Sequence, residues 1–302
     1  MENFALILLA IFAGYLLKNL KILPKDAPVV LNQFVIYISL PAMILLQIPK
    51  LSFSIDMMIP IIISWLVMII TAILTLYTCK ILSFSKEVTG SLLLVTILTN
   101  SSFMGIPIIN AYMGESALPY VLVYDQLGTF IALATYGTFI ASYYASKDNL
   151  TLKIIGFKVV TFPPFIALII SLFLMGISYD EIIEKVLTSF ASTIVPVALV
   201  AVGLQLQLKL PAHEIKPFSV SLFIKLIIAP LIAFLITLIF GWTTQSATVS
   251  ILEAGMAQMI TAGAIASMAG LAPRLSSAIV GYGILISFFT TYIIYELLKI
   301  GI

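Results

Sequence analysis

The sequence predicts an all-α membrane protein of about ten transmembrane helices, arranged as two inverted repeats of five. The 302 residues are 62% hydrophobic and only 9% charged, with a mean hydropathy of +1.19, whereas a soluble domain carries roughly 25% charged residues. The chain divides into about ten apolar stretches, each long enough to cross a bilayer core of about 30 Å. Polar segments interrupt one such stretch in each half of the chain.

The predicted spans are separated by short loops, and no soluble domain is inserted between them. The first span is expected to be retained in the mature protein, because a secretion signal begins with positive charge and this chain begins Met1-Glu2-Asn3. The spans are expected at 4–20, 28–48, 57–81, 88–113, 118–146, 152–175, 181–208, 217–240, 246–270 and 275–299.

The placement of lysine and arginine predicts that both termini lie outside the cytoplasm. Cytoplasmic loops carry an excess of basic residues. The opposite set of loops has only Lys50, Lys185 and Lys299, while Lys225 lies within a span. The loops expected in the cytoplasm carry Lys18, Lys21, Lys25, Lys80, Lys86, Lys147, Lys153, Lys158, Lys209, Lys216 and Arg274.

A cytoplasmic linker at 147–151 divides the chain into a first repeat at 1–146 and a second at 152–302. Because five is an odd number, the second set of spans must enter the membrane in the opposite orientation. Weak internal similarity supports the repeat, since the fourth span ends in Ala111-Tyr112-Met113-Gly114 and the ninth in Ser267-Met268-Ala269-Gly270. Inverted repeats of this kind are typical of secondary transporters.

The two interrupted segments are Asn100–Pro107 and Glu253–Gly263. In lipid, a helix break survives only where it lines a protein cavity. Proline removes a helical hydrogen bond and glycine permits unusual backbone angles, so the freed N–H groups and the helix dipole can face an anion. The alternative is that Pro107 only kinks the helix, and that the side chains of Ser101 and Ser102 form hydrogen bonds with the freed backbone groups. The residues expected to bind substrate are Asn100, Ser101, Ser102, Gly105, Pro107, Thr261 and Gly263.

Ionisable residues within the apolar spans are candidates for coupling transport to an ion gradient. Such residues cost at least about 2.5–3.5 kcal/mol at mid-bilayer and usually mark functional sites. A buried carboxylate without a partner takes up a proton, whereas one that faces a bound cation stays ionised. The expected ligands of sodium or a proton are Asp125, Thr129, Glu253 and Gln258, with Lys225 as the counter-ion. In the structural alternatives, Asp125 pairs with Lys225 to hold the bundle together, or Lys225 snorkels to the surface.

Other classes of function lack the residues that they need. A single Cys79 excludes an intramolecular disulfide, and one His213, in a polar loop, cannot build a metal centre or a catalytic triad. We therefore expect that the protein is not an enzyme and that it binds no organic cofactor and no metal ion other than sodium. A channel is disfavoured because no span shows a regular polar stripe. The expected partners are a small organic anion and the lipid bilayer, without nucleic acid, and a homodimer is an open alternative.

Several motifs resemble the auxin efflux carrier family of bacteria and plants. They are Gly14-Tyr15-Leu16-Leu17, Leu40-Pro41, Asn100–Pro107, Asp125–Gly128 and Lys225–Pro230. The resemblance covers nearly the whole chain and implies ten helices in two inverted repeats, whose broken fourth and ninth helices cross at the site. It also implies a carrier in the cell membrane that moves a small organic anion, such as a mono- or dicarboxylate, by alternating access.

The Glu253–Gln258 stretch is similar to the sodium-binding stretch of the bile acid–sodium symporters, which share the crossed-helix plan. That resemblance implies cation ligation by Glu253, Gln258, Asn100 and Thr129. Ala257 stands where many relatives among the auxin carriers have proline. The alternatives are therefore a sodium- or proton-coupled symporter for larger organic anions and a non-transporting membrane sensor.

Overall fold

The computed structural model describes residues 2–50, 55–145, 160–161, 163–205 and 211–301, and these residues form helices. The predicted linker at 147–151 lies outside the described residues. In the first half the elements are α1 (Glu2–Asn19), α2 (Ala27–Phe34), η1 (Val35–Ser39), α3 (Leu40–Gln47), η2 (Ile48–Lys50), η3 (Ile55–Met57), α4 (Met58–Ile81), α5 (Lys86–Val95), η4 (Ser101–Gly105), α6 (Ile106–Met113), η5 (Glu115–Ala117), α7 (Leu118–Val123), η6 (Tyr124–Phe130), η7 (Leu133–Gly137) and α8 (Thr138–Ala145).

The second half is also built from helices of different lengths, one of which is interrupted. Its elements are α10 (Pro163–Phe173), α11 (Glu181–Ser192), α12 (Ile194–Gln205), α13 (Ala212–Phe223), η8 (Ile224–Ile228), α14 (Ala229–Phe240), α15 (Gln245–Ala254), α16 (Ile260–Met268) and α17 (Pro273–Gly301). The elements η1, η4, η6, η7 and η8 are π-helical turns, which commonly occur at functional sites.

Four helical stretches are long and apolar enough to cross a membrane by length and composition: Ala27–Leu46, Met58–Ile81, Ala212–Phe240 and Pro273–Ile300. Large apolar side chains also cover the outer faces of the helices; the exposed fraction is 82% for Phe173. Contiguous apolar surface of this kind requires an apolar partner. The chain is therefore an all-helical protein that passes through the membrane more than once.

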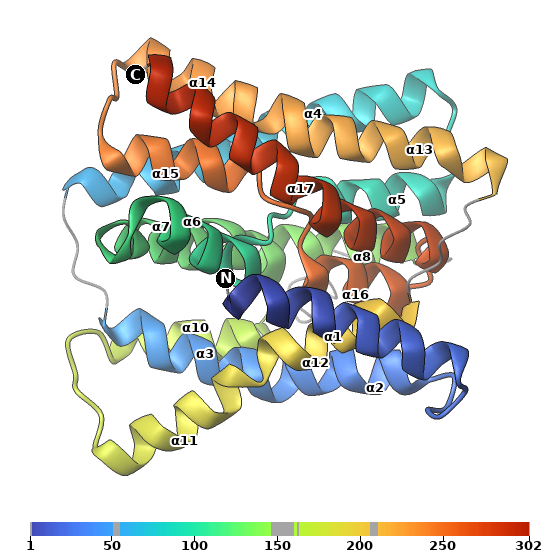
Figure 1. Ribbon diagram of the computed structural model, residues 1–302, viewed down its shortest axis with the longest axis horizontal. Coiled ribbons are helices and arrows are strands. Elements are labelled where there is room, and N and C mark those ends of the chain that lie inside the picture. The colour runs from blue at the N-terminus through green and yellow to red at the C-terminus, as the bar shows by residue number, and fades with distance from the viewer. Residues whose placement is uncertain (1, 51–54, 146–159, 162, 206–210, 302) are drawn as a thin grey trace.

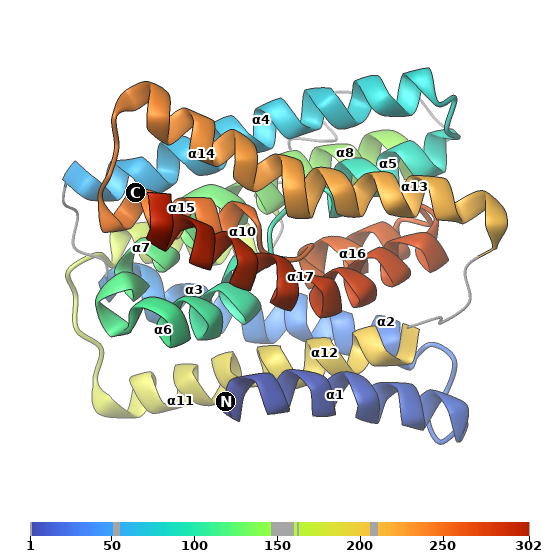
Figure 2. The same ribbon diagram turned by 45° about the horizontal axis from the view of Figure 1, so that its top comes forward.

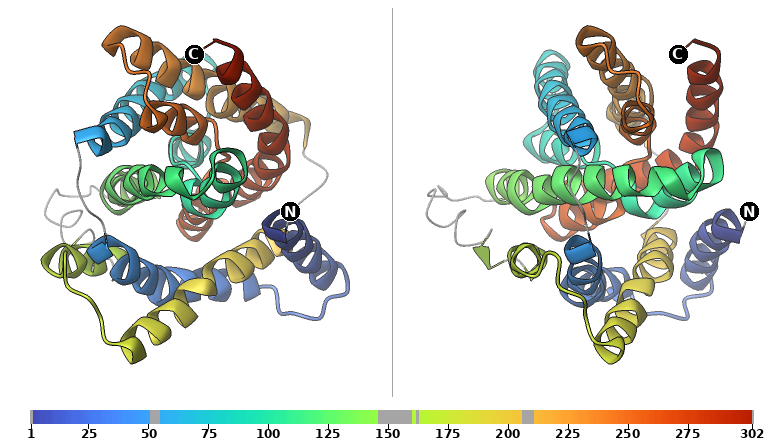
Figure 3. Two further views of the ribbon diagram at one scale, coloured as in Figure 1. Left: turned by 60° about the vertical axis from the view of Figure 1, so that its left-hand side comes forward. Right: turned by 90° about the vertical axis from the view of Figure 1, so that its left-hand side faces the viewer.

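The helices form two groups that run along the same axis (Figures 1 and 2). A flanking layer consists of α1–α3 and α10–α12, and a main bundle consists of α4–α8 and α13–α17 (Figure 3). Each group therefore contains helices from both halves of the chain. In the flanking layer α1 packs along α12, and α3 packs against α10 and α11.

Glycines bring α1 and α12 into backbone contact. A Cβ atom on Gly14 would lie 2.2 Å from the carbonyl oxygen of Val200, and one on Gly203 would lie 2.1 Å from that of Ile11. Small residues at such crossings let transmembrane helices approach closely enough for extensive van der Waals contact. The flanking layer thus depends on the absence of side chains at these two positions.

Candidate substrate and ion site

Helices α5 and α15 both end inside the main bundle, and helical structure resumes only after a short non-helical segment (Figure 1). The first break lies between Val95, where α5 ends, and Ser101, where η4 begins. The second lies between Ala254, at the end of α15, and Ile260, at the start of α16. Each half of the chain therefore contributes one broken helix to the centre of the bundle.

The two breaks form backbone hydrogen bonds with each other. Thr99 and Gln258 form an isolated antiparallel bridge. The N–H of Asn100 donates to the carbonyl oxygen of Ala257 at 2.9 Å, and the N–H of Met259 donates to that of Leu98 at 2.9 Å. A backbone group left unpaired in lipid costs several kcal/mol. Each break thus supplies hydrogen-bond partners for backbone groups of the other break.

The first break begins earlier than the predicted segment Asn100–Pro107, whereas the second lies within the predicted segment Glu253–Gly263. Gly105 has helical backbone angles, with φ −58° and ψ −55°, and Gly263 lies within α16. Pro107 lies in the first turn of α6, directly after the π-helical turn η4. The prediction that these three residues interrupt their helices is therefore wrong. Pro107 cannot donate a helical hydrogen bond to the preceding turn, and that turn is π-helical here.

Asp125 is fully buried in η6 and is hydrogen-bonded through both carboxyl oxygens. The hydroxyl of Ser101 donates to Oδ1 at 2.5 Å, and Nε2 of Gln126 donates to Oδ2 at 2.6 Å. Asp125 thus holds the first turn of η4 against η6. No ion pair between Asp125 and Lys225 occurs among the described residues, so the alternative in which they pair directly is wrong.

Lys225 points into the protein from η8, and only 1% of it is exposed. Its ammonium donates to the hydroxyl of Thr99, within the first break. Glu253 also acts electrostatically on it. The alternative in which Lys225 snorkels to the surface is therefore wrong. A buried ammonium is costly unless it is paired, and here its charge is directed at the junction of the two breaks.

Glu253 lies in the last turn of α15, two residues before Gly255 opens the second break. Both of its carboxyl oxygens are buried and have no hydrogen-bond partner among the described residues. The carboxyl group lies against Gly105, because a Cβ atom on that glycine would be 2.1 Å from Oε1. The glycine therefore makes room for the acidic side chain, which is the role that Gly105 has in this structure.

Further polar atoms around the junction are buried and have no hydrogen-bond partner in the described part of the chain. Such atoms are rare in folded proteins and call for a ligand, an ion or water. They offer both oxygen ligands for a cation and N–H donors for an anion. They are Asn100 Nδ2, Gln126 Oε1, Thr129 Oγ1, Gln258 Oε1, Gln258 Nε2 and Thr261 Oγ1.

The structure brings most of the predicted site residues to one place and adds three that the sequence analysis missed. The hydroxyl of Thr99 accepts a hydrogen bond from the buried Lys225 ammonium. Tyr124 is also fully buried and lies within electrostatic range of Thr99 and Glu253. Gly283 of α17 accommodates the Gln258 amide, since a Cβ atom there would lie 1.7 Å from Oε1. Thr99 directly precedes the predicted residue Asn100, and Tyr124 directly precedes Asp125. This adjacency in the sequence is the one signal that could have pointed to them.

Among the described residues no cluster of three or more His, Cys, Asp or Glu could hold a metal ion.

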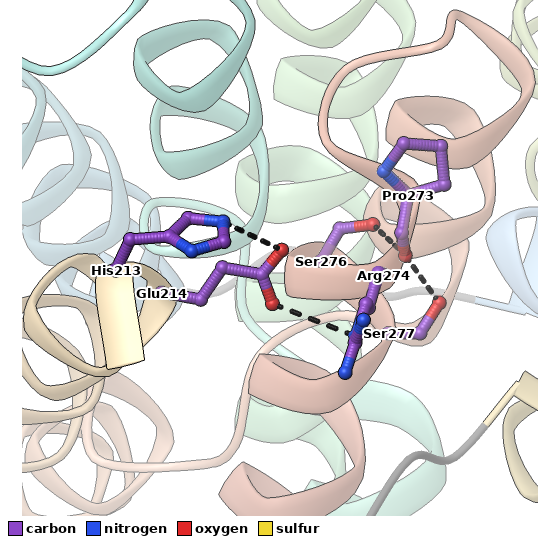
Figure 4. A network of polar contacts seen from close by, with 6 residues as sticks. All are labelled: His213, Glu214, Pro273, Arg274, Ser276 and Ser277. Atoms are coloured by element: carbon purple, nitrogen blue, oxygen red, sulfur yellow. Dashed lines mark hydrogen bonds and ion pairs between the residues drawn. The ribbon is translucent and has the colours of Figure 1, made fainter. Parts of the chain in front are cut away.

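A separate polar network ties the start of α13 to the start of α17, far from the breaks in sequence (Figure 4). Glu214 lies between His213, with Oε1 to Nε2 at 4.0 Å, and Arg274, with Oε2 to Nε at 3.8 Å. The side chain of His213 is 80% exposed. It is therefore a surface residue and has no part in the buried cluster.

Broken helices that meet around buried polar groups are typical of membrane transport proteins. The chain belongs to the family described as membrane transport protein, which it matches over residues 1–295, and this confirms the predicted auxin efflux carrier resemblance. It is 26% identical over 266 residues to an uncharacterised transporter of Methanocaldococcus jannaschii, covering 85% of each chain. It is 22% identical over 273 residues to one from Methanothermobacter thermautotrophicus, covering 88% of this chain and 87% of that protein.

The contact between Gly105 and Glu253 can be tested by a double-mutant cycle. We expect Gly105→Ala to lower the free energy of unfolding by about 1–3 kcal/mol, because the added methyl group overlaps the Glu253 carboxyl group. In a Glu253→Ala background the same change should cost less than about 0.5 kcal/mol, because the overlap is gone. Thermal unfolding of the purified variants measures both. Gly137→Ala is the matched control, since its nearest neighbour would lie at an ordinary 3.4 Å. If Gly105→Ala lowered the free energy of unfolding equally in the two backgrounds, Gly105 and Glu253 would not be in contact.

Proposed function

We propose that this protein is a carrier that moves a small organic anion, such as a mono- or dicarboxylate, across the cell membrane by alternating access. The observation that carries the proposal is the pairing of two helix breaks around buried polar atoms without partners. In transporters with inverted repeats, substrate and ions bind where such discontinuous helices meet near the bilayer midplane.

The proposed layout has ten spans in two inverted repeats, at 1–146 and 152–302, with broken fourth and ninth helices that cross. Two observations support it. The breaks after α5 and after α15 fall in corresponding positions of the two halves. The flanking layer also combines α1–α3 with α10–α12, which are the opening helices of each proposed repeat (Figure 3). The excess of basic residues in alternate loops supports termini outside the cytoplasm.

The junction offers the groups that a carboxylate needs. Asn100 Nδ2 and Gln258 Nε2 are donors without a hydrogen-bond partner among the residues that the structure describes. The first turn of α16 begins at Ile260, so its free N–H groups and the positive end of its dipole lie next to the second break. Lys225 adds a buried positive charge. We assign substrate binding to Asn100 of the first break, to Ser101 and Ser102 at the start of η4 and to Thr261 at the start of α16. Gly105, Pro107 and Gly263 are assigned as close-packed neighbours.

The same junction supports coupling to sodium or protons. Glu253 has two unpaired carboxyl oxygens, and Gln258 Oε1 and Thr129 Oγ1 are unpaired as well. Oxygen atoms are the ligands that hard cations prefer. An isolated buried carboxylate either binds a cation or takes up a proton. We therefore propose that Glu253 is the main coupling group and that Asp125, which is already hydrogen-bonded, acts through Ser101.

The second candidate function is a sodium-coupled symporter of the bile acid type. The unpaired oxygens of Glu253 and Gln258 favour it over a carrier without coupling. The two candidates differ in the size of the substrate and in the requirement for sodium. A radiolabelled uptake screen in proteoliposomes separates them, because only the symporter would move bile acid-sized anions and only with a sodium gradient.

Removing the Asn100 amide should weaken substrate binding. Loss of one hydrogen bond to a charged group costs about 1.5–3 kcal/mol, so we expect Asn100→Ala to raise the half-saturating concentration of the transported anion by roughly ten- to a hundredfold. Concentration-dependent uptake in proteoliposomes measures this change. Asn110→Ala is the matched control, because Asn110 is exposed on α6. Wild-type uptake by Asn100→Ala would place the substrate elsewhere.

Neutralising Glu253 should abolish the response of transport to an ion gradient. Glu253→Gln keeps the shape of the side chain but removes its charge, so neither sodium nor a proton gradient should stimulate uptake any longer. Glu181→Gln changes a surface residue, whose side chain is 77% exposed, and should keep the wild-type response. An unchanged response to sodium and pH in Glu253→Gln would show that Glu253 is not the coupling group.

A further inference from the structure

An apolar groove of about 420 Å³ opens on the outside of the main bundle, between the η8–α14 helix and α17. The wall on α17 is formed by residues between Thr290 and Leu298, roughly 12 Å along the helix axis. Leu231 on one wall and Leu297 on the other are 48% and 63% exposed. The groove is thus long, apolar and open toward the surrounding membrane.

A polar pocket of about 310 Å³ lies at one end of this groove, and Leu298 lines both. The ammonium of Lys299 lies 4.1 Å from the centre of the Tyr295 ring and donates to Glu296 Oε1 at 3.0 Å. Gln245, the first residue of α15, also lines this pocket. The N-cap residue Thr244 does not cap α15 through its side chain, which is hydrogen-bonded to Ser246, but its carbonyl oxygen accepts from the N–H of Ala247. Because α6 and α17 end here and α15 begins here, the polar pocket lies at the membrane surface.

We propose that the groove and the polar pocket together bind one membrane phospholipid, with an acyl chain in the groove and the phosphate beside Lys299. The groove lies along membrane-spanning helices, where acyl chains are the available apolar ligand, and it is elongated in the direction that a chain would take. A cation at the interfacial end of such a groove attracts a phosphate. An apolar helix from a second copy would cover the groove but would bring no anionic group to the ammonium of Lys299, which lies beside Glu296 and Tyr295 at the polar end.

The floor of the groove is in contact with the second helix break. A Cβ atom on Gly255, the first residue of that break, would lie 3.0 Å from Ile294 Cδ1 and 3.3 Å from Pro230 Cβ. Ile294 and Pro230 both line the groove. A bound acyl chain would therefore press these two side chains against the point where α15 ends. Lipid occupancy would restrict the movement of the broken helix without any contact between the lipid and the substrate.

Native mass spectrometry of the full chain tests this site without any transport assay. The protein is reconstituted in vesicles of equal parts phosphatidylcholine and phosphatidylglycerol, extracted in mild detergent, and scored for retained phospholipid. We expect one retained phospholipid for each wild-type chain. Leu231→Trp and Leu297→Trp, which fill the groove from opposite walls, should reduce retention at least about tenfold. Ile239→Trp is the matched control on α14, because it is 78% exposed and lies outside the groove.

The headgroup is tested separately. Lys299→Gln should weaken phospholipid retention, whereas the exposed Lys185→Gln should not, and diacylglycerol, which lacks the phosphate, should be retained less than either phospholipid. Retention that is equal in wild type, Leu231→Trp and Leu297→Trp would overturn the groove as a lipid site, as would a lipid-free dimer that these variants dissociate. Retention unchanged by Lys299→Gln would overturn the position of the phosphate.

Discussion

Backbone amides and carbonyls cannot stay unpaired at the depth of the hydrocarbon, and this constraint determines how the centre of the protein is built. Two helices are broken there, and each break is tolerated because the other satisfies it through the Asn100–Ala257 and Leu98–Met259 hydrogen bonds. Either break alone would leave these groups unpaired. The antiparallel pairing also fixes the position of Thr99 next to Gln258, and so the polar side chains on both breaks meet at one junction.

The buried charges differ in how well they are partnered. The Asp125 carboxyl oxygens accept hydrogen bonds from Ser101 and Gln126, and the Lys225 ammonium donates one to Thr99. Glu253 alone has both carboxyl oxygens free of hydrogen bonds among the described residues, although it is fully buried. Charged groups in such surroundings are stable only with a partner. These oxygens of Glu253 are therefore the observation that supports our proposal of a coupling ion or proton at this residue.

The sequence was sufficient to predict the membrane class and the pair of interrupted helices, because hydrophobic length and buried polar residues are local signals. It also identified Asp125 and Glu253, since acidic residues are rare in apolar spans. It placed the first break too far along the chain, because Gly105 and Pro107 look like helix breakers but lie in the helical turns of η4 and α6. The contact between Lys225 and Thr99 joins residues 126 positions apart. No local pattern in the sequence predicts such a contact.

The central claim is that the transported anion binds at the junction of the two breaks. Substrate protection of a cysteine placed there tests it most directly. Thr261→Cys, in a Cys79→Ala background, replaces an unpaired buried hydroxyl with a thiol of similar size. We predict that the transported anion slows alkylation of this cysteine, with half-maximal protection near its half-saturating concentration for uptake. An alkylation rate that saturating anion leaves unchanged, in a variant that still transports, would contradict the claim.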